Sequence, residues 1–102
     1  MDYGLNPQAI ATIHEILRGF PQVKRAILFG SRAKGCARPG SDIDLTLEGE
    51  SLDESIVSEI DTAFYDSLLP YRFSLSVRSL LRDRDFLAHI ERVGVTFYER
   101  EC

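Results

Sequence analysis

Two segments of the chain alternate strictly between polar and apolar residues, and this alternation limits what the chain can fold into. In residues 42–47 (Asp-Ile-Asp-Leu-Thr-Leu) and 72–77 (Arg-Phe-Ser-Leu-Ser-Val), every second side chain is apolar. Successive side chains of a β-strand point to opposite faces, so both segments are predicted to be strands with one apolar and one polar face. A third run, residues 26–29, is wholly apolar and ends at Gly30. That pattern is typical of a strand buried on both faces.

The rest of the chain shows helical spacing of its apolar residues, and Ser51 with Glu54 fits a capping box at the start of the second long helix. The expected order is a helix over 6–20, a strand over 25–30, a loop and short helix over 31–37, a turn over 38–41, the strand 42–47, a helix over 51–69, the strand 72–77, a helix that includes 86–90 and is stopped by Gly94, and a strand over 95–98. Helices that alternate with strands predict an α/β fold, a small mixed β-sheet with helices packed against it.

The length, charge and composition of the chain exclude several classes of protein. The chain has 102 residues, enough for a single domain over 1–102. A net charge of −4 argues against general nucleic-acid binding, which needs a basic face. No apolar run approaches the roughly 18–20 residues of a membrane span, and the N-terminus does not resemble a signal peptide, so we expect a cytoplasmic protein. Cys36 and Cys102 lie in no metal-binding spacing and are expected to be reduced thiols.

The polar face of the strand over residues 42–47 begins with two carboxylates. Asp42 and Asp44 are two residues apart, so both side chains project from one face, with Cα atoms about 6.6 Å apart. Adjacent carboxylates repel each other unless a cation neutralises them. Mg²⁺ is usually held by one or two carboxylates together with substrate phosphates. A solvated polar strand face would explain the Asp-x-Asp pattern alone, and the residues before it decide between the two interpretations.

The segment before the carboxylates favours phosphate binding. Gly30 allows the backbone to approach a ligand closely, and Ser31 offers a hydroxyl and a backbone N–H at the start of a short helix. Arg32, Lys34 and Arg38 add positive charge nearby, although each could also belong to a solvated basic surface. Together with the carboxylate pair, these residues predict a site for a nucleotide triphosphate and a divalent cation.

The residues Gly30-Ser31, followed by Ser41-Asp42-Ile43-Asp44, resemble the motif of the DNA polymerase β-like nucleotidyltransferase superfamily. The small size resembles its minimal nucleotidyltransferase (MNT) branch. The resemblance implies that Gly30 and Ser31 contact the nucleotide phosphates, and that Asp42 and Asp44 hold Mg²⁺. It also implies ATP as donor, transfer of a nucleoside monophosphate such as AMP to a hydroxyl, and a HEPN-domain toxin as the partner of an antitoxin.

One position departs from the family pattern. The family has a third carboxylate on the next strand, which helps to bind a metal and acts as the base, and Ser74 stands there in this chain. Loss of a general base typically costs roughly 10²–10⁴-fold in rate. Two hypotheses follow, an active adenylyltransferase and a catalytically impaired, nucleotide-binding antitoxin that acts by contact. An aminoglycoside-modifying enzyme is a weaker third, because the chain has little room for a separate acceptor-binding domain.

Three other features favour ordinary structural roles. His14 and His89 lie on predicted helices without a ligand partner at useful spacing, so we expect both on helix faces outside a catalytic site. The run over residues 82–85 (Arg-Asp-Arg-Asp) is most simply a solvated, self-paired group of charges.

Overall fold

The computed structural model describes residues 3–35 and 41–100. Three residues with predicted roles therefore lie outside the described residues, namely Cys36, Arg38 and Cys102. Most of the predicted turn over 38–41 lies outside them too. In chain order the elements are α1 (Pro7–Arg18), β1 (Arg25–Phe29), α2 (Gly30–Lys34), β2 (Ile43–Glu48), α3 (Glu54–Asp66), β3 (Phe73–Val77), the 3₁₀ turn η1 (Arg78–Leu80), α4 (Arg84–Val93) and β4 (Val95–Glu99).

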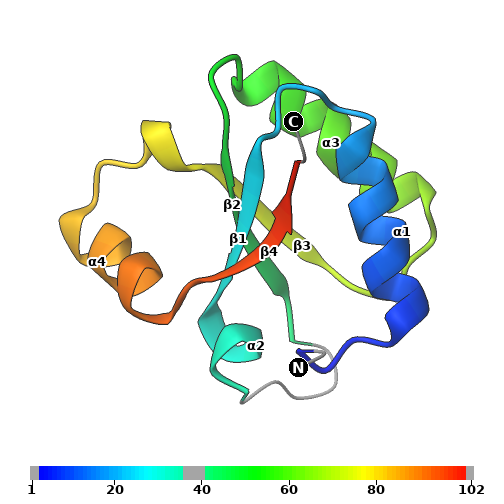
Figure 1. The fold of residues 1–102 in the computed structure, drawn as a ribbon, viewed down its shortest axis with the longest axis horizontal. Coiled ribbons are helices and arrows are strands. Elements are labelled where there is room, and N and C mark those ends of the chain that lie inside the picture. The colour runs from blue at the N-terminus through cyan, green and yellow to red at the C-terminus, as the bar shows by residue number, and fades with distance from the viewer. Residues whose placement is uncertain (1–2, 36–40, 101–102) are drawn as a thin grey trace.

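The four strands form one mixed sheet in the order β3-β2-β1-β4 (Figure 1). Strand β1 pairs antiparallel with both β2 and β4, while β2 and β3 run parallel. The parallel pair needs a long crossover, and α3 supplies it. The predicted mixed sheet covered by helices is therefore confirmed, and the site-bearing strand β2 lies inside the sheet.

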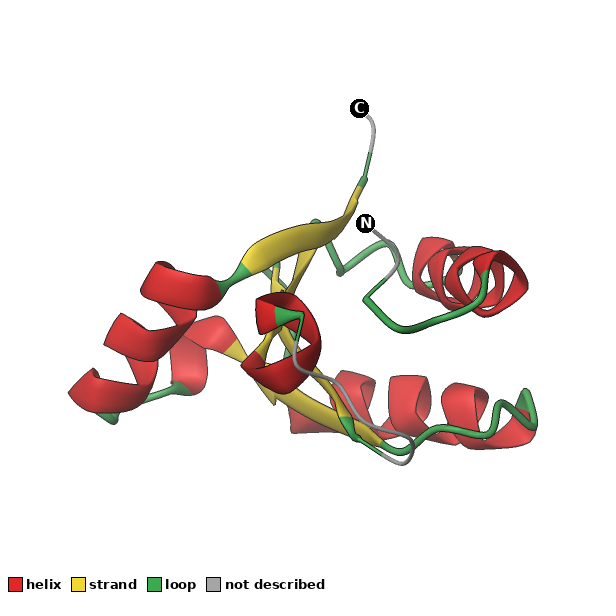
Figure 2. Ribbon diagram, turned by 90° about the horizontal axis from the view of Figure 1, so that it is seen from below, coloured by secondary structure: helices red, strands yellow, loops and turns green. Residues whose placement is uncertain are grey.

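The two faces of the sheet carry different helices. Figure 2 shows α1 and α3 on one side and α4 on the other. The larger core forms under α1 and α3, where Leu28 and Leu45 from the strands are buried with Ile13 and Phe64 from the helices. A smaller core lies under α4 and centres on Ile27, Phe29 and Ile90. Residues of β1 that face α4 share that face with the polar side of β2, because directly opposite residues of paired strands point the same way.

The structure corrects one predicted helix start and confirms another. The capping-box prediction for Ser51 and Glu54 is wrong, because Asp53 is the N-cap of α3 and its side chain accepts a 2.9 Å hydrogen bond from the N–H of Ile56. Aspartate is as good an N-cap as serine, and the buried Leu52 just before it fixes the chain at the entry to the helix. The predicted start of α1 is confirmed, since Asn6 caps it.

The charge run over residues 82–85 also has a specific structural role. The Asp83 side chain accepts hydrogen bonds from the N–H groups of Asp85 and Phe86, at 2.9 and 3.3 Å, and thereby caps α4. The run is thus more than a self-paired group of surface charges, because one of its acids fixes where α4 begins. None of the helices in the described ranges is long and apolar enough to cross a membrane.

Candidate functional site

The candidate site lies at the end of the sheet where β1 finishes and β2 begins. Asp42 is exposed just before β2, and Asp44 is half-buried as the second residue of that strand. Asp44 lies directly opposite Phe29 in the antiparallel pair, so its side chain projects on the face that α4 covers farther along β1. The charge of Asp42 acts on Asp44, so the two acids lie near each other at the start of β2.

Gly30 lies directly against the Asp44 carboxylate. Its backbone has a φ of +77°, a conformation that side chains with a Cβ rarely adopt. A Cβ placed on residue 30 would overlap Oδ2 of Asp44 and lie 3.3 Å from its Cγ. Glycine is therefore required twice, once by the turn from β1 into α2 and once by the space that the carboxylate occupies.

The pKa of Asp44 depends on its burial and on the charges around it. Partial burial and the neighbouring charge of Asp42 raise the pKa of Asp44 above its ordinary value, and the positive charges of Arg32 and His89 offset part of the rise. The folded chain therefore holds two repelling carboxylates side by side.

A divalent cation would relieve that repulsion, and carboxylate oxygens are suitable Mg²⁺ ligands, so Asp42 and Asp44 fit the cation that the sequence predicts. Over residues 3–35 and 41–100, no group of three or more His, Cys, Asp or Glu side chains gathers as a metal site. The donor set in this part of the chain is thus a carboxylate pair without a third acid.

Ser74 lies beside this pair. In the parallel ladder between β2 and β3, Ser74 is the register partner of Asp44, and its side chain is exposed. The sequence could predict its polar face but not its register with Asp44. An acid at position 74 would complete a three-carboxylate cluster, whereas the serine presents only a hydroxyl.

Arg32 has a structural role that the sequence did not reveal. Its side chain is only 3% exposed, and its guanidinium donates hydrogen bonds to the carbonyl oxygens of Tyr3 (3.0 Å) and Ser41 (2.8 and 3.3 Å). It also lies 5.3 Å from the centre of the Tyr71 ring, within range of a cation–π interaction. Three of its donors are thus used within the fold, so Arg32 does not belong to a solvated basic surface, and its contact with phosphate stays a prediction.

The other predicted phosphate contacts lie on α2. Ser31 is half-buried in its first turn, and Lys34 is exposed at its end. The structure therefore keeps both near the end of β1, where Gly30 meets Asp44.

His89 is a residue that the sequence analysis assigned to a plain helix face. It is half-buried on α4, with its ring edge-on to Phe29 at 6.3 Å between centroids. Because Phe29 is the register partner of Asp44, α4 brings His89 close enough to influence the Asp44 carboxylate. Sequence spacing gave no signal for this approach, since 45 positions separate the two residues and only the packing of α4 joins them.

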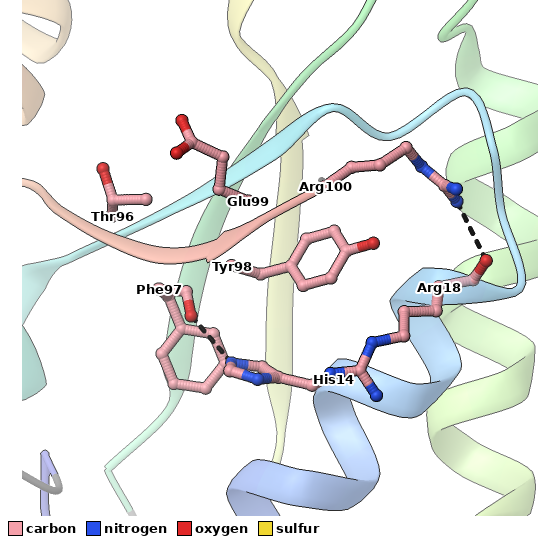
Figure 3. A pocket seen from close by; sticks show the side chains of 7 residues that line it. All are labelled: His14, Arg18, Thr96, Phe97, Tyr98, Glu99 and Arg100. Carbon is pink, nitrogen blue, oxygen red and sulfur yellow. Dashed lines mark hydrogen bonds between the residues drawn. The ribbon is translucent and has the colours of Figure 1, made fainter. Parts of the chain in front are cut away.

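His14 behaves as predicted and lies elsewhere. It lines a cavity of about 700 Å³ between α1 and the edge strand β4, and none of the predicted site residues lines that cavity (Figure 3). Its Nε2 donates a 2.7 Å hydrogen bond to the carbonyl of Phe97, and Arg100 donates one to the carbonyl of Arg18. These bonds attach α1 to the sheet edge.

Comparisons with known proteins agree with this geometry. Residues 11–102 match the family model described as "Polymerase beta, Nucleotidyltransferase". The chain is 32% identical over 98 residues to the "Probable protein adenylyltransferase MntA" of Haemophilus influenzae, an alignment that covers 95% of this chain and 85% of that protein.

Two solved structures share the fold. A toxin–antitoxin complex with AMP-PNP gives a TM-score of 0.72 at 20% identity, over 90% of this chain and 74% of the other. A complex of the tri-AMPylated Shewanella oneidensis HEPN toxin with its MNT antitoxin gives 0.66 at 18% identity, over 91% and 71%. With the family model spanning nearly the whole sequence, the chain belongs to the polymerase β nucleotidyltransferase family.

Proposed function

We propose that this chain binds Mg-ATP and transfers AMP to a hydroxyl of a HEPN-domain toxin, which it thereby neutralises as an antitoxin. The observation that carries the proposal is the contact between Gly30 and the Asp44 carboxylate, with Asp42 beside it. This arrangement puts the glycine backbone next to a pair of acids, which suits a triphosphate and its cation. A cytoplasmic location belongs to the proposal, because ATP is supplied there.

The names of the similar proteins support the choice of acceptor. The Haemophilus relative is described as a protein adenylyltransferase, and the Shewanella complex contains an AMPylated HEPN toxin. A protein acceptor also fits a chain of this size, in which the described elements all belong to one sheet and its covering helices.

The chemistry assigns a task to each part of the site. The acceptor oxygen forms a bond to the α-phosphorus, the bond from that phosphorus to the β-phosphate oxygen breaks, and pyrophosphate leaves. Asp42 and Asp44 would hold Mg²⁺, which supplies neutralisation of the triphosphate charge. Gly30 and Ser31 bind the departing phosphates through backbone N–H and hydroxyl groups, and Lys34 adds positive charge beside them. Because Ser74 is not a base at neutral pH, the acceptor proton passes to solvent.

Ser74 favours a second candidate function. With a serine in register with Asp44, the site lacks the carboxylate that would take the acceptor proton. The chain would then bind nucleotide and neutralise the toxin by contact, without turnover. Both functions use the same site, so they differ only in whether AMP is transferred.

The deciding experiment follows label from α-phosphate-labelled ATP with Mg²⁺ to the purified HEPN-domain partner. Wild type is expected to label the partner, and Asp44→Asn, which keeps the shape but removes the charge, is expected not to. An unlabelled partner in an intact complex with wild type would reject transfer and favour neutralisation by contact.

A further inference from the structure

His89 lies close to the carboxylate pair and has no task yet in the proposed function. It is half-buried on α4, and among the residues that the structure describes neither of its ring nitrogens forms a hydrogen bond or an ion pair. Neither nitrogen belongs to the buried polar atoms that lack a partner, so both are accessible to solvent. The imidazole of His89 is therefore held in place by its ring while its polar atoms stay available to a ligand.

The neighbours of His89 on α4 show which way its side chain faces. Ile90 is buried in the small core between α4 and the sheet. Because successive residues of a helix are turned by about 100°, His89 and Glu91 lie on opposite flanks of Ile90. Glu91 accepts a 3.1 Å hydrogen bond from Arg78, which also donates one of 3.5 Å to Glu48 at the end of β2. The flank of Glu91 thus faces the end of β2, and the flank of His89 faces the opposite way, toward the start of that strand.

The contacts of α4 agree with this direction. The helix packs against both β1 and the short helix α2 (Figure 1). The His89 ring lies edge-on to Phe29, with 6.3 Å between the ring centroids, and Phe29 is the register partner of Asp44. The charge of His89 acts on the Asp44 carboxylate, although these two described side chains form no ion pair. His89 is therefore near the carboxylate, and its nitrogens are not used by it.

The order of the strands places His89 and Ser74 on opposite sides of Asp44. Strand β2 lies between β3 and β1. Ser74 is the register partner of Asp44 on β3, and Phe29 is its register partner on β1. Directly opposite residues of paired strands point to the same face, so all three side chains share one face of the sheet. Along that face, Ser74 lies on the β3 side of Asp44, and His89, which contacts Phe29, lies on the β1 side.

The two sides of Asp44 suit different parts of the proposed reaction. In phosphoryl transfer the attacking and leaving oxygens lie roughly in line, on opposite sides of the phosphorus. Ser74 stands where a carboxylate would take the acceptor proton, so the acceptor belongs on the β3 side. The leaving phosphates then belong on the β1 side, where Gly30 directly follows the last residue of β1. His89 shares that side, which excludes it as a substitute for the missing base and favours a contact with the phosphates.

We propose that His89 is a nucleotide-binding residue that donates a ring N–H hydrogen bond to the β- and γ-phosphates of ATP, and to the pyrophosphate that leaves. The imidazole keeps its proton throughout, since either tautomer has an N–H to donate. The inference rests on the proposed function for the identity of the nucleotide. It does not require that AMP is transferred, because a chain that only binds ATP would use the same contact.

The test measures the affinity of the chain for Mg-ATP and for Mg-AMP, which ends at the α-phosphate and lacks the groups that His89 would hold. His89→Phe keeps a ring against Phe29 but removes both nitrogens. It is expected to weaken ATP binding by at least about tenfold and AMP binding by less than about twofold, because a hydrogen bond to a charged group is lost only with ATP. His89→Gln keeps a side-chain N–H donor and is expected to stay within about threefold of wild type for both nucleotides.

The second histidine of the sequence supplies the matched control. His14→Phe makes the same change on α1, where the ring lies against Phe97 and bonds to its carbonyl oxygen. This variant is expected to lower the Tm and to leave both nucleotide affinities unchanged. His89→Ala serves beside His89→Phe, with the same expected affinities, so that a fault in packing the larger ring does not decide the result. The Tm of each variant shows that it is folded during the titrations.

Several results would overturn the inference. An ATP affinity that is unchanged in folded His89→Phe and His89→Ala would remove His89 from the nucleotide site. Equal losses of ATP and AMP affinity would place it against the nucleoside or the α-phosphate instead. An unchanged ATP affinity together with slower label transfer would move His89 to the acceptor side of Asp44.

The inference and the proposed function fail in different ways. If ATP binding depends on His89 but wild type transfers no label to the partner, the adenylyltransferase proposal falls and the phosphate contact stands. If wild type and His89→Phe label the partner equally at limiting ATP, the phosphate contact falls and the enzyme stands.

Discussion

Gly30 and Asp44 share a space in which no side chain on residue 30 can fit, because its Cβ would overlap the Asp44 carboxylate. Gly30→Ala is therefore expected to displace that carboxylate and to lower label transfer, or Mg-ATP affinity if the chain does not turn over, by about tenfold or more. The positive φ would also lower the free energy of unfolding of the variant by about 1–2 kcal/mol, because the alanine Cβ is strained there.

Gly35→Ala separates the two effects. Gly35 has a φ of +78°, almost the same as Gly30, but nothing lies within 4 Å of the Cβ it would gain. It is expected to lose similar stability in urea denaturation while keeping its nucleotide affinity. Equal loss of affinity in both variants would mean that the backbone, and not the carboxylate contact, is what matters at Gly30.

The crowding of Asp44 predicts a pH-dependent stability difference. Its pKa is raised in the folded chain, so the stability this group contributes is fully present below its unfolded pKa of about 3.9 and is lost as pH rises through the folded pKa. Asp44→Asn is therefore expected to raise the Tm at pH 7 in EDTA, with the gain shrinking as the pH falls toward the unfolded pKa. Addition of Mg²⁺ should raise the Tm of wild type and not of the variant. A lower Tm for the variant at pH 7 in EDTA would contradict the repulsion argument.

The buried guanidinium of Arg32 predicts a stability effect that lysine cannot rescue. Arg32→Lys loses the fork that reaches the carbonyls of Tyr3 and Ser41 together, and is expected to cost about 2–4 kcal/mol in urea denaturation. Lys34→Ala, on the exposed end of the same short helix, should change stability by less than about 0.5 kcal/mol and weaken nucleotide binding. An Arg32→Lys variant of normal stability would contradict this structural role of Arg32.

The register of Ser74 with Asp44 predicts a gain of function. Ser74→Asp places a third carboxylate beside the pair, and is expected to raise label transfer by about 10²-fold if the missing base limits the rate. The double variant Ser74→Asp with Asp44→Asn should be inactive, which excludes a contaminating activity. No gain in the single variant, with nucleotide affinity intact, would show that proton removal is not limiting.

The alternation of residues 42–47 was enough to predict that Asp42 and Asp44 share one face, because the period of a strand is fixed by its backbone. The same reasoning placed Ser74 on a polar face. It could not give the register that puts Ser74 beside Asp44, since strand pairing depends on the crossover through α3 and on the packing beneath the sheet.

Local sequence patterns could not predict the structural roles of Arg32, Asp83 and His89. A basic residue in a polar segment is usually solvated, but Arg32 is buried because two distant carbonyls converge on it. Asp83 is one of four alternating charges in the sequence, and only the start of α4 in the structure shows that it is a helix cap. His89 reaches the site through the packing of α4 on Phe29, which no spacing in the sequence encodes.

The link that Arg32 makes between Tyr3 and Ser41 has a practical consequence for handling the protein. The Arg32 guanidinium joins Tyr3, near the N-terminus, to the residue just before Asp42, so a fusion tag or a truncation at the N-terminus is expected to disturb the start of the carboxylate strand. Strand β4 ends at Glu99, which pairs with Arg25 at the end of β1 farthest from Gly30. Dyes, tags and surface attachment therefore belong after β4, where they leave the geometry around Asp44 undisturbed.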